Sequence, residues 1–174
     1  MRLGVIGGTG LVEIDVADRL GDAAATLVRQ DDIHVDTAYG SVPIRGCTLL
    51  IGGQERELIF LQRHHNGSGH GRPPHKIDHK ANMAAMNDAN VDAIVSVCSV
   101  GAIAASFPPG KVALAHQYID FTGVSTTFHD DESVFTSATV PFDEALNTKL
   151  ENILRTSQSF SKDEPMHYTC LLYT

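Results

Sequence analysis

The sequence predicts an α/β fold in which helices flank a central sheet. Apolar runs of strand length occupy residues 3–6, 57–62 and 93–98. Residues 76–90 instead place alanines and an isoleucine near one face at helical spacing, and residues 146–157 show a second helical stripe. Strand and helix patterns that alternate along a chain are typical of a layered α/β architecture.

The elements are expected in a definite order. The first strand, 3–6, leads into a glycine turn at 7–10, and residues 11–32 show no clear pattern. The remaining expectations are strands at 33–42, 47–51 and 57–62 with turns at 39–40, 45–46 and 52–55, a helix at 76–90, a strand at 93–98, a turn at 108–110 before a strand at 111–115, a loop-rich stretch at 116–142, a helix at 146–157 and a last strand at 166–172. The length of 174 residues indicates one domain.

Composition excludes several classes of protein. The net charge of -8 disfavours nucleic-acid binding, which needs a basic face. The cysteines Cys47, Cys98 and Cys170 are odd in number and far apart, which indicates reduced thiols rather than a disulfide framework. Neither a signal peptide nor an apolar run of the ~20 residues that span a membrane is visible in the sequence. We therefore expect a cytoplasmic protein without membrane partners.

Residues 63–82 form the one basic stretch of this acidic chain. They hold five of the nine histidines among arginines and lysines, and they follow the apolar run 58–61. A flexible basic loop at the end of a buried strand is a common anion site in α/β proteins, so we expect phosphate or a similar group here. His75 and His79 lie four apart and could share a helical face, but the H-E-x-x-H form is absent and lysines flank them, which disfavours a metal site.

Three strand ends carry groups suited to an anion. Gly7-Gly8-Thr9-Gly10 offers backbone amides and a hydroxyl, Arg63-His64 offers a forked cation and an imidazole, and Cys98-Ser99 precedes Gly101. Taken alone, each strand end also has a purely structural explanation: a tight turn for the first, a solvated loop for the second and close packing for the third. In a mostly parallel sheet, however, such ends can cluster at one edge, so their joint occurrence is more specific.

Five segments match the pattern of one known family in order: Ile6-Gly7-Gly8-Thr9-Gly10-Leu11, Val35-Asp36-Thr37-Ala38-Tyr39-Gly40, Arg63-His64 with Pro73-Pro74-His75-Lys76-Ile77, Lys80-Ala81-Asn82, and His116-Gln117-Tyr118-Ile119-Asp120-Phe121-Thr122. They resemble the methylthioadenosine phosphorylases of the trimeric purine nucleoside phosphorylase class. The third and fifth segments look most like the bacterial methylthioinosine phosphorylase branch. The resemblance implies a phosphorylase/hydrolase-like fold with a mixed central sheet.

The resemblance also implies a reaction. Inorganic phosphate, the co-substrate, would attack C1′ of 5′-methylthioadenosine or 5′-methylthioinosine, with no further cofactor and no metal, in a homotrimer. The phosphate contacts map to Thr9, Arg63, His64, Cys98 and Ser99, with Gly7, Gly8, Gly10 and Gly101 as supporting loop residues. No residue of the chain is assigned as catalytic.

Several positions depart from the family pattern. Cys98-Ser99 stand where the family commonly has Thr-Ala or Asn-Ala, and Gly123-Val124-Ser125 stand where it has an arginine. Leu171-Leu172-Tyr173-Thr174 occupy the place of its Gly-Pro-Arg motif, so the fold is expected to be incomplete at the C-terminus. Two hypotheses follow: a nucleoside phosphorylase, or a truncated chain that keeps part of the phosphate site without activity.

Overall fold

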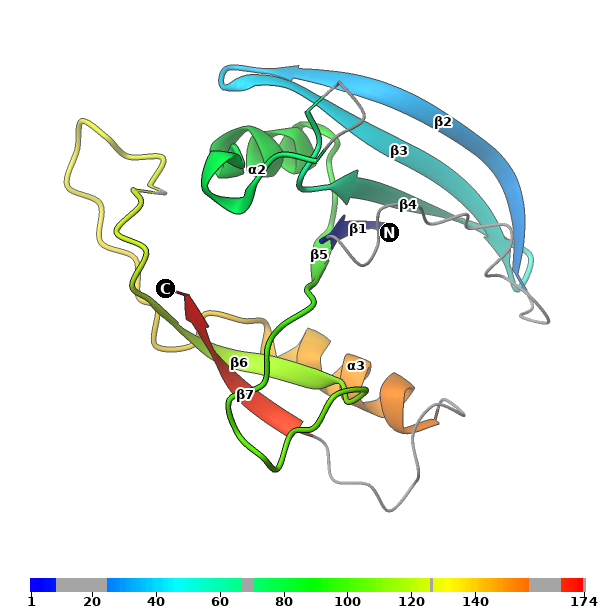
Figure 1. Ribbon diagram of the computed structural model, residues 1–174. Helices are drawn as coiled ribbons and strands as arrows, with labels where there is room; N and C mark the ends of the chain where they lie inside the picture. The colour runs from blue at the N-terminus through cyan, green and yellow to red at the C-terminus, as the bar shows by residue number, and fades with distance from the viewer. Residues whose placement is uncertain (9–24, 67–70, 126, 157–166, 174) are drawn as a thin grey trace. The chain divides into compact units, whose positions relative to one another are not determined.

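The computed structural model describes residues 1–8, 25–66, 71–125, 127–156 and 167–173, the last stretch by its backbone (Figure 1). The chain divides into two compact units, Met1–Val100 and Gly101–Thr174. We refer to them as the first and the second unit and describe each by itself. Whether they act as one domain stays a prediction.

The first unit is built on a five-stranded mixed sheet of order β2-β3-β4-β1-β5. Its strands are β1 (Arg2–Gly7), β2 (Ala25–Thr37), β3 (Gly40–Ile51), β4 (Gln54–Gln62) and β5 (Ala93–Val97). The hairpin strands β2, β3 and β4 pair antiparallel, whereas β1 lies between β4 and β5 and runs parallel to both. The mixed α/β architecture expected from the sequence is confirmed.

Helix α2 (His79–Asp88) covers one face of this sheet, after the short 3-10 turn η2 (Pro74–Lys76) (Figure 1). Asp78 caps its N-terminus by accepting a hydrogen bond of 2.9 Å from the Ala81 amide. The buried face of α2 joins strand side chains in one apolar core: Ile6, Val42, Ile44, Ile59, Leu61, Ala81, Ala85 and Met86. The sequence of α2 is only weakly amphipathic, so the helix is stabilised mainly by packing of this buried face against the sheet.

Three sequence expectations for the first unit are wrong in detail. The strand expected to begin at 33 begins earlier, as β2 at Ala25, whereas the turn expected at 39–40 is confirmed within one residue: β2 ends at Thr37 and β3 begins at Gly40, whose φ of 133° favours glycine. The turn expected at 45–46 is a strand, since Gly46 pairs with Asp31 on one side and Ile59 on the other. The helix begins three residues late, because Ile77 is extended and Asp78 provides the cap.

The described residues of the second unit form two parallel strands, β6 (Ala113–Asp120) and β7 (His167–Tyr173), and one helix, α3 (Glu144–Thr156). Strand β6 continues five residues beyond its expected end at 115 into the stretch expected as loop, because its backbone pairs with β7 as far as Asp120. The helix and last strand lie within two residues of their expected bounds. In the described parts of the chain, no helix is long and apolar enough to cross a membrane.

Candidate anion-binding site

Three parallel strands of the first unit end side by side. Gly7, the last residue of β1, is in register with Gln62 of β4 and with Val97 of β5. The pairing continues one residue further, because the Arg63 amide donates to the Gly7 carbonyl and the Gly8 amide donates to the Val97 carbonyl, each over 3.1 Å. The structure therefore brings together the first residues after the three strands, which the sequence had grouped as a phosphate site.

The Arg63 guanidinium lies at the centre of this edge. Its Nη1 donates to Cys98 Sγ over 2.9 Å, and its Nε faces His64 Nε2 over 3.3 Å. A Cβ added at Gly8 would lie 3.0 Å from Arg63 Nη2, so the missing side chain of Gly8 makes room for the cation. Arg63 is half-buried, and no carboxylate of the described residues pairs with it. A half-buried cation with neutral neighbours suits an anion that supplies the missing charge.

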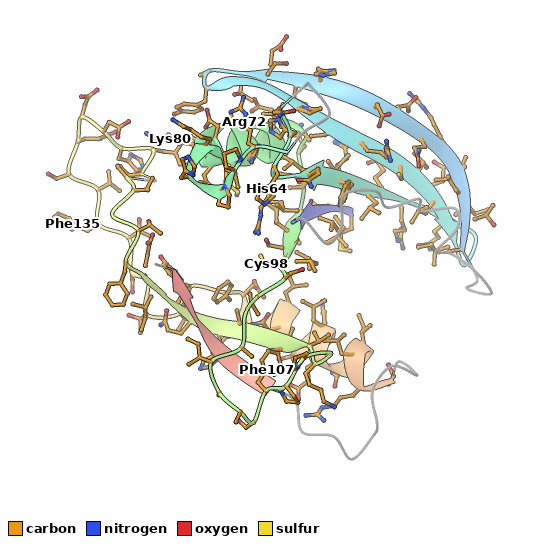
Figure 2. The ribbon with its side chains drawn as sticks, in the orientation of Figure 1. His64, Arg72, Lys80, Cys98, Phe107 and Phe135 are labelled. Atoms are coloured by element: carbon orange, nitrogen blue, oxygen red, sulfur yellow. The ribbon has the colours of Figure 1, made fainter. Side chains whose placement is uncertain are left out.

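His64, labelled in Figure 2, follows Arg63 in the chain. It is buried, with 6% of its surface exposed. Its Nδ1 lies 2.8 Å from the Arg72 carbonyl oxygen, and the Arg72 amide donates back to the His64 carbonyl over 2.6 Å. Because a carbonyl only accepts, these partners assign the proton to Nδ1 and leave Nε2 as the acceptor for Arg63.

Two side chains missed by sequence reasoning hold the turn that carries Arg63. The Gln62 amide oxygen accepts from the His64 backbone N–H over 2.6 Å. Asn82 Nδ2 donates to the Arg63 carbonyl over 3.3 Å, while Asn82 Oδ1 lies 2.7 Å from His65 Nε2. One signal could have found Asn82: it stands on the alanine-rich face of a predicted helix, where a buried amide needs partners.

Of the other predicted phosphate contacts and loop residues that the structure describes, it places only Cys98 against Arg63. Cys98 is half-buried and also faces Ser96 Oγ at 3.9 Å. Ser99 is exposed, and Gly101 opens the second unit with nothing within 4 Å of an added Cβ. Thr9 and Gly10 lie outside the described residues. The geometry of the site thus rests on Gly7, Gly8, Arg63, His64 and Cys98.

In the second unit, the segment His116–Thr122 ends strand β6. Asp120 Oδ1 accepts from the Thr122 amide over 2.7 Å, and the Thr122 hydroxyl and amide lower the pKa of this exposed carboxyl. A 330 Å³ hollow on this unit is lined by His116, Gln117, Thr139, Val140, Phe142, Glu144 and Asn147. Its lining shares no residue with the predicted phosphate contacts, so this hollow adds nothing to that site.

A second hollow, of 290 Å³, lies in the first unit beside the end of α2 and the strands β2, β3 and β4. Arg2 and Arg29 contribute to its lining, but each arginine is paired with a carboxylate, Arg2 with Glu57 at 2.8 Å and Arg29 with Asp31. Their charges are therefore already compensated, in contrast to that of Arg63.

A family model described as the phosphorylase superfamily matches residues 2–172 of this chain. A probable 6-oxopurine nucleoside phosphorylase from Dictyoglomus turgidum is 37% identical over 124 residues, which is 70% of this chain and 40% of the relative. A probable S-methyl-5′-thioinosine phosphorylase from Methanocaldococcus jannaschii is 32% identical over 170 residues, which is 97% of this chain and 59% of the relative.

Among solved structures, a methylthioadenosine phosphorylase from an antarctic soil metagenomic library has a similar fold. The TM-score is 0.69 at 23% identity, and the match covers 98% of this chain and 53% of that chain. This likeness extends the sequence match to the three-dimensional fold. The chain spans about half the length of the curated relatives that it matches.

Proposed function

From the premise that this chain belongs to the phosphorylase superfamily, we propose that it binds inorganic phosphate at Gly8, Arg63, His64 and Cys98 and serves the phosphorolysis of a purine nucleoside. Membership in this superfamily agrees with the resemblance described from the sequence. Thr9, Ser99, Gly10 and Gly101 are included in the proposal as further contacts or supporting loop residues.

One observation supports the phosphate site above all. The Arg63 guanidinium lies at the edge formed by the ends of β4, β1 and β5, against the Cys98 thiol and beside Gly8, which has no side chain. Among the described residues, all hydrogen-bond partners of this guanidinium are neutral. A planar fork of N–H donors matches two phosphate oxygens, and the charge is retained at any physiological pH. Glycine at the end of β1 lets the backbone approach the same anion.

The chemistry of phosphorolysis fits such a site. A phosphate oxygen forms a bond to C1′ of the ribose while the bond from C1′ to the purine nitrogen breaks, and its electron pair leaves with the purine. The sugar passes through an oxocarbenium-like state, so positioning and electrostatic stabilisation carry the reaction. Arg63 would hold the dianion below C1′, and no covalent enzyme intermediate is required. We assign no residue of this chain to protonation of the departing purine.

We propose 5′-methylthioadenosine or 5′-methylthioinosine as the nucleoside. The names of the relatives support a purine substrate, and the Methanocaldococcus jannaschii relative is named for a methylthio-nucleoside. We further propose a cytoplasmic homotrimer, as the sequence resemblance implies. Light scattering of the purified chain tests the trimer.

Calorimetric titration with inorganic phosphate, followed by an assay of purine release from both methylthio-nucleosides, tests the function. We expect saturable phosphate binding that sulfate weakens, and release that depends on phosphate. Binding without release from either nucleoside would favour the second hypothesis, an inactive chain that keeps the phosphate site. Absence of saturable phosphate binding to the folded chain would overturn the proposal.

A further inference from the structure

The buried amide of Asn82 lies beneath the turn formed by Arg63, His64 and His65. Only 3% of Asn82 is exposed, and it stands in the first turns of α2 next to Ala81, on the face that packs against the sheet. A buried amide costs free energy unless its groups are paired, so an apolar residue would be the simpler choice for packing. The hydrogen bonds of Asn82 must therefore explain its presence.

Both ends of the Asn82 amide contact the Arg63–His65 turn. Nδ2 donates to the Arg63 carbonyl over 3.3 Å, and Oδ1 lies 2.7 Å from His65 Nε2. Rotating the amide by half a turn would place Oδ1 against the Arg63 carbonyl, two acceptors facing each other. The Arg63 carbonyl therefore requires Nδ2 on its side, so His65 Nε2 is the donor to Oδ1, and this second bond helps hold the amide in that orientation.

Helix α2 gives this contact a rigid base. Ala85 and Met86, three and four residues after Asn82, are fully buried in the core of the first unit. At the start of the helix, the backbone N–H of Asn82 donates to the backbone carbonyl of Asp78, the N-cap residue, over 3.1 Å. The Arg63 backbone is thus held from two directions, by the Gly7 carbonyl of β1 and by the Asn82 side chain of α2.

We propose that Asn82 is a positioning residue for the anion site: it fixes the Arg63 backbone so that the guanidinium stays between Gly8 and Cys98. This inference rests on the proposed phosphate binding. Asn82 acts through Arg63 and does not contact the anion. A misplacement of a binding group by an ångström is enough to weaken a preorganised site, although the fold itself is retained.

The test compares four variants of the full chain. Asn82→Leu removes both hydrogen bonds at similar volume, and His65→Phe removes only the bond that orients the amide. Asn87→Leu changes an exposed asparagine of the same helix, and Ile59→Val removes one buried methyl group from the core, four residues before Arg63. Phosphate affinity is measured by calorimetry and folding by circular dichroism and thermal unfolding.

We expect Asn82→Leu to raise the Kd for inorganic phosphate about tenfold, and His65→Phe to raise it by less, since the amide keeps its bond to Arg63. Asn87→Leu and Ile59→Val should keep the wild-type Kd, even though Ile59→Val lowers the thermal midpoint. This contrast separates positioning from a general loss of stability. If Asn82→Leu does not fold, the phosphate Kd of His65→Phe is compared with that of Asn87→Leu and Ile59→Val instead.

A second measurement reports the position of Arg63 without phosphate. The rate of Cys98 alkylation by iodoacetamide, followed on the Cys98 peptide by mass spectrometry, should depend on whether the guanidinium contacts the thiol, as it does here over 2.9 Å. Arg63→Ala defines the rate of the uncovered thiol. In Asn82→Leu the rate should move from the wild-type value toward that reference, whereas Asn87→Leu should keep the wild-type value.

The two readouts distinguish the two ideas. If the wild-type chain does not bind phosphate but Asn82→Leu shifts the Cys98 rate toward that of Arg63→Ala, the proposed function fails and the positioning of Arg63 by Asn82 stands. A folded Asn82→Leu chain with the wild-type Cys98 rate and, where phosphate binds, the wild-type Kd overturns the inference.

Discussion

The two units of the chain bury their apolar residues to very different extents. In the first unit, α2 and the five-stranded sheet enclose a continuous core in which Val42, Leu61 and Met86 are completely buried. Among the residues of the second unit whose side chains are described, Leu114 is the buried hydrophobic residue, whereas Phe121 and Phe135 are 70% and 95% exposed. The two strands and the helix formed by the described residues of this unit offer little surface against which such side chains could pack.

This difference bears directly on function. The residues of the candidate anion site that the structure describes up to Ser99 all belong to the first unit, where a packed core can hold them in fixed positions. The second unit carries the family-like segment His116–Thr122 on a strand with an exposed end. The packed core of the first unit therefore supports the part of the proposed phosphate site that lies in this unit.

The largest expected effect comes from the core. Leu61→Ala should lower the free energy of unfolding by about 2–5 kcal/mol, because it removes a fully buried side chain and leaves a cavity. Phe135→Ala, at a side chain that is 95% exposed, should change it by less than about 0.5 kcal/mol. Urea unfolding measures both. Equal losses for the two variants would contradict the contrast between the units.

The second-largest expected effect is the loss of phosphate affinity on substitution of Arg63. Arg63→Ala should weaken phosphate binding by about 1.5–3 kcal/mol, the range of a hydrogen bond to a charged group, with little change in unfolding. In an active chain the KM for phosphate should rise and kcat should fall. Arg63→Lys keeps the charge but loses the fork and should lie between. Unchanged phosphate binding in Arg63→Ala would remove this residue from the site.

A smaller effect on phosphate is expected from Gly8→Ala. The added Cβ would lie 3.0 Å from Arg63 Nη2 and 3.3 Å from Cζ, so the guanidinium must shift by a few tenths of an ångström. We expect a Kd raised by about two- to tenfold. Gly46→Ala, on strand β3 and outside the site, is the matched control, since the nearest atom to its added Cβ, Ile33 Cδ1, lies at an ordinary contact distance of 3.7 Å. A loss of phosphate affinity in Gly46→Ala as large as that in Gly8→Ala would contradict this role of Gly8.

The smallest effect concerns the Asp32–Arg45 pair on the β2–β3 hairpin. Arg45 Nε donates to Asp32 Oδ1 over 2.7 Å, and this hydrogen bond lowers the pKa of Asp32 below 3.8. A carboxyl whose pKa is lower in the folded than in the unfolded state stabilises the protein. This stabilisation is fully present above the unfolded-state pKa and is lost as the pH falls through the folded-state pKa. Asp32→Asn should therefore cost less than about 1 kcal/mol at neutral pH, since the pair is exposed.

The pH profile of unfolding provides the check on this pair. The stability difference between wild type and Asp32→Asn should be constant at neutral pH and should vanish in acid, once Asp32 is protonated in both states. A difference that grows as the pH falls below 3.8 would have the wrong sign for this pair.

The sequence by itself determined which residues could form the site. The apolar runs that form β1, β4 and β5 are local patterns that can be read from the sequence. The residues that follow them could be recognised as binding candidates, because the ends of strands contribute little to the hydrophobic core. The same local reasoning failed at Gly46, since a glycine permits either a turn or a strand and its neighbours across the sheet decide between them.

Only the tertiary structure decided how these residues meet. The order β4-β1-β5 and the register of Gly7 with Gln62 and Val97 depend on hydrogen bonds between segments far apart in the chain. The proton assigned to His64 Nδ1 follows from the Arg72 carbonyl. The two bonds of Asn82 exist because α2 packs on the sheet beneath the Arg63 turn. Pairing and burial of this kind are set by the folded chain as a whole, so no local pattern could have shown them.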